Sequence, residues 1–161
     1  MAGEFVTGQN FGNSSTASVG TITVTVSGTT AGHLLVASLS GQASNVAYST
    51  ATGWTKLTSA DSITEGAVFY RIADGTSSDN FTPVWAGDDG PCSASVCEYS
   101  GLDSTPTIEA WDENTTFIDS DQSYGAPINA GSVTPTTANG MAITCHIGPD
   151  ERDANESELS I

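Results

Sequence analysis

Basic side chains are almost missing from this chain. Lys56, Arg71 and Arg152 stand against 19 acidic residues, and the formal net charge is −16 over 161 residues. A surface of this sign cannot neutralise a phosphate backbone, so the composition argues against nucleic acid as a partner. Anionic membrane surfaces are disfavoured for the same reason. Such acidity favours solubility, with a dedicated cation-binding role as the alternative.

Long helix-forming side chains and long apolar runs are also scarce. Ser, Thr, Gly, Ala and Val dominate the sequence, whereas a helical protein needs long straight-chain residues on its exposed faces. No segment reaches the roughly 20 apolar residues of a membrane span. Residues 1–4 lack the positive region of a signal peptide. The composition therefore predicts an all-β protein. Neither a membrane span nor a signal peptide is visible in residues 1–161, and a leader removed from a longer protein is the alternative.

The three cysteines make an odd number. Cys92 and Cys97 lie five residues apart, so on a regular strand they point to opposite faces about 16 Å from each other, too far for a disulfide. Either one can meet Cys145 only across strands. Buried free thiols are the favoured interpretation, and a bridge to Cys145 is the alternative.

Alternating and continuous apolar patterns mark the strongest strands. Residues 20–26 (GTITVTV) place Ile22, Val24 and Val26 on one face and three threonines on the other, which is typical of a half-buried strand. Residues 33–39 are apolar on both faces and should lie centrally. Further strands are predicted at residues 54–57, 67–72, 81–85, 93–99, 107–111 and 141–147.

Other segments give weaker signals. Phe5, Val6 and Phe11 are isolated among polar residues, which predicts a short first strand and a loose loop. Pro83 cannot donate a ladder hydrogen bond, so its strand should lie at an edge or contain a bulge. Residues 150–161 are mostly polar and charged, and make a weak closing strand.

Roughly nine or ten short strands, spaced by about 8 to 15 residues and without an amphipathic helix, predict an antiparallel β-sandwich resembling a jelly roll. We expect a single domain over residues 1–161. Its weak tail predicts a sheet that is incomplete at the C-terminus or completed in some other way.

No catalytic constellation stands out. His33 and His146 both lie in apolar strand runs, and no Gly-x-Ser-x-Gly elbow presents a serine. Satisfied structural histidines are therefore favoured, and we expect no enzymatic activity. Glu98 and Arg71 each lie within an apolar strand. A buried carboxylate without a partner is costly, so we predict a structural ion pair between these two side chains.

An acidic loop is the candidate metal site. Asp119, Asp121 and Ser123 offer oxygen ligands at alternate positions, as calcium loops do. The loop departs from the EF-hand pattern because Gly125 comes one position late and Ala130 replaces the final glutamate. Calcium is therefore one interpretation and a solvated acidic loop the other. No other cofactor is expected.

Tryptophans offer a second candidate surface. Trp54 and Trp85, with Trp111, could stack on sugar rings if exposed, whereas core packing is the usual place of a strand-borne tryptophan. Both interpretations remain open at this stage.

Four short motifs resemble, in their order, those of β-sandwich domains of tailed-phage virion proteins and of some bacterial surface proteins. They cover about residues 20 to 147 and are Gly32-His33-Leu34-Leu35-Val36-Ala37, Gly53-Trp54-Thr55-Lys56-Leu57, Val68-Phe69-Tyr70-Arg71-Ile72-Ala73 and Val96-Cys97-Glu98-Tyr99-Ser100-Gly101-Leu102. The resemblance implies a structural or adhesive role and transfers no catalytic residue.

We therefore expect a non-enzymatic structural protein of a phage particle, such as a decoration or tail-associated module located in the virion. It would act as a homo-oligomer or by docking onto a larger protein assembly. A missing leader and free thiols agree with assembly in the cytosol. The alternative is a secreted carbohydrate-binding or adhesion module, extracellular or on the cell surface, and a glycoside-active enzyme ranks third.

Overall fold

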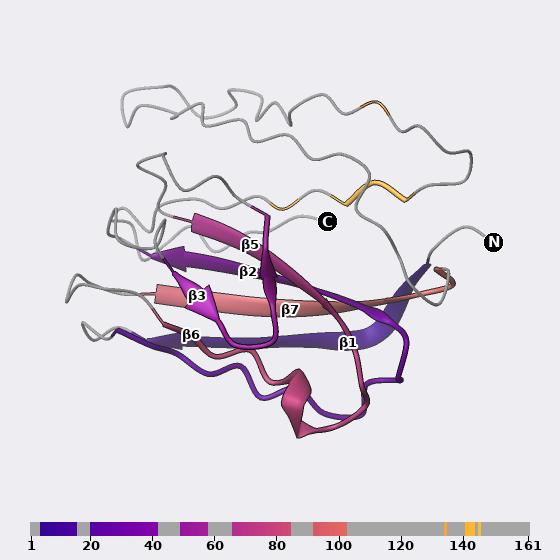
Figure 1. Ribbon diagram of the computed structural model, residues 1–161, viewed down its shortest axis with the longest axis horizontal. Coiled ribbons are helices and arrows are strands. Elements are labelled where there is room, and N and C mark those ends of the chain that lie inside the picture. Colours follow the sequence, from indigo (N-terminus) through magenta and orange to yellow (C-terminus); the bar gives the residue numbers. More distant parts are fainter. Residues whose placement is uncertain are drawn as a thin grey trace.

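The computed structural model describes residues 4–15, 20–41, 49–57, 66–84 and 92–102, together with 134, 141–143 and 145. Seven strands and one short 3-10 turn lie in these ranges (Figure 1). They are β1 (Glu4–Ser15), β2 (Leu34–Gly41), β3 (Thr50–Ala51), β4 (Thr55–Lys56), β5 (Gly66–Ile72), η2 (Ser77–Asp79), β6 (Pro83–Val84) and β7 (Cys92–Ser100). No helix in the described ranges is long and apolar enough to cross a membrane.

Five strands form the larger sheet, in the order β1-β7-β2-β5-β4, and every pairing in it is antiparallel. β2 lies in the middle, between β7 and β5. Its apolar residues on both faces explain this place, because Leu34, Leu35, Val36 and Ala37 are all buried. The central position predicted for residues 33–39 is therefore confirmed.

A smaller layer covers one face of this sheet. β3 pairs with β6. Residues 20–26 form one bridge to β6, Thr21↔Val84, and one to the residue two positions ahead of it, Val24↔Phe81. The predicted alternation along residues 20–26 is confirmed, since burial switches with every residue. The segment is not a continuous strand, however, because it forms ladder contacts only at these two bridges.

The core lies between the larger sheet and the smaller layer. Phe69 from β5 meets Phe81 at 5.2 Å between ring centroids, and Trp54 meets Phe81 edge-on at 5.0 Å. Each fully buried side chain of this size contributes roughly 1.5–3 kcal/mol through burial. The all-β, antiparallel class is confirmed, while the jelly-roll connectivity and the single domain over 1–161 stay predictions.

Three local expectations need comment. β1 is a strand of 12 residues, so the short first strand predicted around Phe5 and Val6 is wrong; backbone pairing with β7 holds it despite its weak pattern. The edge position predicted for Pro83 agrees with the strand order, because β6, among the described residues, pairs with β3 alone as a strand and has only the isolated Thr21↔Val84 bridge on its other side. Its missing N–H is tolerated at the first position of a two-residue strand. Residues 141–143 and 145 show no strand, and the rest of that predicted strand, like residues 107–111, lies outside the described residues.

Candidate functional site

Charged side chains gather at one end of the core-facing side of the larger sheet. Leu35 on β2 pairs with Arg71 on β5 and with Glu98 on β7. Directly opposite residues point to the same face, so these three share the side on which Leu35 belongs to the core. Arg71 and Glu98 are therefore two strand spacings apart, about 10 Å.

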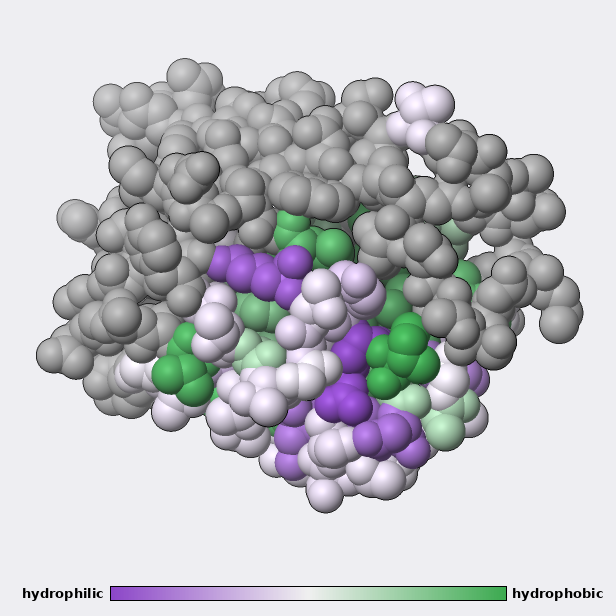
Figure 2. Space-filling model, viewed as in Figure 1, coloured by the Kyte–Doolittle hydropathy of each residue, from purple (hydrophilic) through white to green (hydrophobic). Residues whose placement is uncertain are grey.

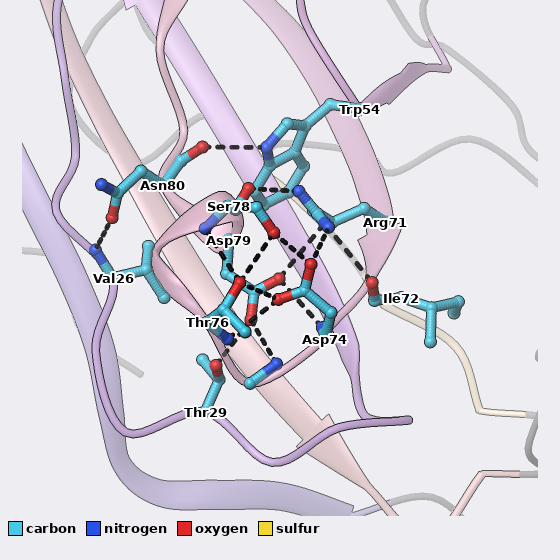
Figure 3. A network of polar contacts seen from close by, with 11 residues as sticks. Val26, Thr29, Trp54, Arg71, Ile72, Asp74, Thr76, Ser78, Asp79 and Asn80 are labelled. Atoms are coloured by element: carbon cyan, nitrogen blue, oxygen red, sulfur yellow. Dashed lines mark hydrogen bonds and ion pairs between the residues drawn. The ribbon is translucent and has the colours of Figure 1, made fainter.

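Arg71 is the centre of a polar network in the loop that follows β5 (Figure 3). Its Nε lies 3.3 Å from Oδ1 of Asp79 and its Nη2 lies 3.3 Å from Oδ2 of Asp74. The Nη1 donates to the carbonyl oxygen of Ser78. The guanidinium also lies over the Trp54 ring, 5.9 Å from its centroid. The guanidinium of Arg71 thus pairs with two carboxylates and lies over the indole ring of Trp54.

Asp79 is fully buried, with 0 % exposure, and both of its oxygens are saturated. Oδ1 accepts the backbone N–H of Asp74 at 3.1 Å in addition to the Arg71 contact. Oδ2 accepts the Thr29 hydroxyl at 2.7 Å and the Gly75 N–H at 3.0 Å. Three donors from two loops and Arg71 from β5 converge on one carboxylate, so Asp79 ties the loop after β5 to the loop before β2.

Asp74 makes the hydrogen bonds at the exposed surface of the same loop. Hydrophilic residues gather in the lower middle of the described surface, at the end of the molecule where this loop lies (Figure 1 and Figure 2). Its Oδ1 accepts the Thr76 N–H at 2.8 Å and the Thr76 hydroxyl at 2.6 Å, and its Oδ2 accepts the Ser78 hydroxyl. These hydroxyl bonds from Ser78 and Thr76, with a further contribution from Arg71, lower the pKa of Asp74 to about 2. The carboxylate form is thereby favoured by hydrogen bonding.

The loop of residues 74–80 also joins the two layers. The Asn80 side-chain oxygen accepts the Val26 N–H at 2.8 Å, and its backbone oxygen accepts the Trp54 indole N–H at 3.2 Å. Gly75 has φ +77°, and a Cβ there would lie 3.4 Å from the Thr29 carbonyl oxygen. A glycine is therefore required where the two loops approach each other.

Glu98 forms a second, separate pair at the end of the sheet. It is 1 % exposed, and its Oε1 lies 2.6 Å from His33 Nδ1 and accepts the Thr30 N–H at 2.9 Å. Its Oε2 is buried without a hydrogen-bond partner. His33 keeps 24 % of its side chain exposed. The predicted structural role of this histidine agrees with the contact.

The ion pair predicted between Arg71 and Glu98 is wrong. Both side chains do lie on the core-facing side of the larger sheet, but Leu35 separates them. The partners come instead from the loops that fold over the end of the sheet: Asp74 and Asp79 for Arg71, and His33 for Glu98. The expectation that each of these charged groups has a partner is confirmed, and in both cases a residue of a loop provides the partner.

Sequence reasoning missed Asp74 and Asp79, which it treated only as parts of a turn. A usable signal was present in the run Asp-Gly-Thr-Ser-Ser-Asp that begins at Asp74, because Asp, Ser and Thr side chains bond to nearby backbone in such turns. The hydroxyl of Thr76 caps η2 in this way, accepting the Ser78 N–H at 3.2 Å.

The predicted glycan and metal residues are only partly described. Trp54 is 8 % exposed and packs between Arg71 and Phe81. Of the two interpretations of this residue, core packing therefore agrees with the structure, because neither ring face is open to a sugar. Trp85, Asp119, Asp121 and Ser123 lie outside the described residues. Within the described part, no group of three or more His, Cys, Asp or Glu side chains could hold a metal ion.

The two cysteines of β7 point to opposite faces of the larger sheet. Cys92 is buried in the core, Cys97 is half-buried on the other face and Cys145 is exposed, and none of the three forms a disulfide. Burial raises the pKa of the Cys97 thiol. Burial and then the charges of Cys97 and Cys145 raise the pKa of Tyr99 to about 12. These groups are held in their neutral, weakly reactive forms.

No family model matches the chain, and comparisons with curated proteins and with solved structures found no significant match either.

Proposed function

We propose that this chain is a non-enzymatic structural module that works by self-association or by docking onto a larger assembly. The observation that carries the proposal is the margin of the larger sheet formed by β1. This strand has 12 residues, and among the described residues it pairs with β7 alone. A long strand edge is a template for pairing with another chain.

The chemistry of the site supports a structural role. The side chains that chemistry would use are engaged in holding loops: Asp79 by four donors, Arg71 by two carboxylates, and Glu98 by His33 and Thr30. A general base needs a free lone pair facing substrate, and the saturated carboxylate of Asp79 offers none.

The phage particle as the larger assembly rests on the sequence resemblance alone. Mass spectrometry of particles purified from an induced culture that encodes the chain tests it. We expect the protein to co-purify with the particles in many copies. Its absence from them, together with specific retention on a glycan array, would favour the adhesion module instead.

Calcium at Asp119, Asp121 and Ser123 is a separate part of the proposal. A ligand that binds only the native state stabilises it by mass action, so excess EDTA should lower the melting temperature and added calcium should restore it. An unchanged melting curve leaves only the solvated acidic loop.

A further inference from the structure

Residues 28–32 lie in the loop that connects residues 20–26 to β2. Three of these five residues are exposed and none is buried, so the segment adds no side chain to the hydrophobic core. It lies against the loop after β5, where a Cβ built on Gly75 would come within 3.5 Å of the backbone nitrogen of Ala31. Few buried apolar contacts place a segment at the low-stability end of a fold. We call residues 28–32 the strap.

Polar contacts to two buried carboxylates hold the strap closed. The Thr29 hydroxyl donates to Oδ2 of Asp79 at 2.7 Å, and the Thr30 N–H donates to Oε1 of Glu98 at 2.9 Å. Asp79 belongs to η2 and Glu98 belongs to β7. Two consecutive residues of the strap are thus attached to two different elements of the fold.

Backbone hydrogen bonds link the rest of the strap to the same attachments. The His33 N–H donates to the Thr30 carbonyl oxygen at 3.1 Å, and the Gly32 N–H donates to the Ala73 carbonyl oxygen at 2.9 Å. Thr30 therefore takes part in two contacts, one through its N–H and one through its carbonyl oxygen. Movement of this residue breaks both contacts at once.

The closed strap is unfavourable for one oxygen of Glu98. The carboxylate is 1 % exposed, and its Oε2 has no hydrogen-bond partner among the described residues. A buried acceptor of this kind lacks the hydrogen bonds that water would give it. Because Thr30 contacts this carboxylate directly, moving the strap away lets water reach Glu98. The free energy that holds the strap closed is reduced accordingly.

Glycines occupy the two ends of the strap. Gly28 has φ +73° and Gly32 has φ +89°, both in the left-handed region. No described atom lies within 4 Å of a Cβ built on Gly32, so this end is loosely packed. Glycine changes φ and ψ at little steric cost, and such residues act as hinges in moving loops. The strap therefore has a point of rotation on each side of Thr29 and Thr30.

We propose that the strap opens and closes as one unit, turning about Gly28 and Gly32 while the larger sheet and the core stay folded. This motion goes beyond the proposed function and does not depend on it. Opening breaks the attachments to Asp79 and Glu98 together, because they are made by neighbouring residues of one short segment. It uncovers Glu98, a carboxylate that the closed state keeps from water.

Native-state hydrogen exchange of the full chain, followed by NMR, tests the proposal. The reporters are the amides of Thr30, Gly32 and His33, whose hydrogen bonds all break on opening. The references are the amides of Val24 and Phe81, each of which donates to the carbonyl of the other. We expect the three reporters to share one protection factor, about tenfold or more below that of the references. Low urea should change it little, because opening exposes little surface.

A single substitution tests whether the strap is one unit. Thr29→Val removes the hydroxyl contact with Asp79, and it should speed the exchange of all three reporters equally, by about fivefold. The Thr29 hydroxyl donates to Asp79 and to none of these three residues, so an equal effect requires a common opening. Thr25→Val is the matched control, the same substitution at an exposed threonine outside the strap, and should leave the reporters unchanged.

Each other outcome overturns the proposal. Different protection factors for the three reporters would show that these residues move independently. Protection equal to that of Val24 and Phe81 would show that the strap opens only when the whole fold does. Exchange as fast as in an unfolded peptide would show that the strap is not closed. Acceleration in Thr29→Val that is confined to one reporter would also contradict a common motion. If this variant does not fold, the protection factors and urea dependence of the wild type decide alone.

Discussion

Two buried carboxylates lie at the same end of the molecule and are treated differently. Asp79 is 0 % exposed and receives four donors, two on each oxygen. Glu98 is 1 % exposed, and both of its contacts fall on Oε1 while Oε2 has no partner. Both carboxylates are removed from water to a similar extent, but Asp79 gains four hydrogen-bond or ion-pair contacts in return and Glu98 only two.

The difference follows from where the donors come from. Asp79 lies in a turn, η2, so nearby N–H groups of the same loop reach it at little extra cost in order. Glu98 lies within β7, where the backbone donors are used by the ladder, and among the described residues its contacts come from the loop ending at His33. A carboxylate in a turn is therefore a stabilising centre, whereas one on a strand depends on a loop that folds over it.

The largest expected effect is that of Asp79→Asn. The amide cannot accept at both positions, so the Thr29 hydroxyl or the Gly75 N–H loses its acceptor and Arg71 loses a buried partner. Breaking a buried pair in this way costs about 3–5 kcal/mol. Urea unfolding followed by circular dichroism measures the change. A loss below that of Asp74→Asn, the matched change at the exposed rim, would contradict the central role of Asp79.

Glu98→Gln should cost less, about 1–2 kcal/mol, because one oxygen remains to accept the Thr30 N–H and the orphan Oε2 was already unpaired. The same urea titration tests it. If Glu98→Gln destabilised the protein as much as Asp79→Asn, the contrast between the two carboxylates would be wrong.

Two adjacent threonines give a finer comparison. Thr29 donates its hydroxyl to Asp79, whereas Thr30 donates its backbone N–H to Glu98. Thr29→Val should cost about 1 kcal/mol, and Thr30→Val should change the free energy of unfolding by much less. Equal losses in the two variants would show that the loop, and not the hydroxyl contact, carries the effect.

The smallest expected effect is on the free energy of unfolding at acidic pH, through Asp74. The folded pKa of Asp74 is about 2, below the ordinary value of 3.8. A depressed pKa contributes stability that is present above pH 4 and is lost as the pH falls toward 2. The stability difference between wild type and Asp74→Asn should therefore shrink across this window, as measured by urea unfolding at several pH values. A difference that stays constant from pH 5 to pH 2 excludes this linkage.

The sequence pattern predicts more about some segments than about others. The buried face of Ile22, Val24 and Val26 and the central place of residues 34–39 follow from the pattern alone, because side-chain direction along an extended chain is a local property. The candidate site was recognised only as two charges, Arg71 and Glu98, that needed partners. Sequence order cannot say which loop closes over the end of a sheet, so the partners were misassigned.

The sequence by itself determined the all-β class, the opposite directions of Cys92 and Cys97, and the need to neutralise Arg71 and Glu98. These depend on composition, on the two-residue period of a strand and on the cost of burying a charge. Only the tertiary structure decided that the polar segment 4–15 forms a long marginal strand, and that Asp79 collects four donors. The strand depends on the backbone of β7, which is distant in sequence, and the carboxylate depends on two backbone N–H groups, on Arg71 and on the Thr29 hydroxyl from the loop before β2. Backbone donors and acceptors are the same in every residue type but proline, so the sequence pattern does not show which of them will meet.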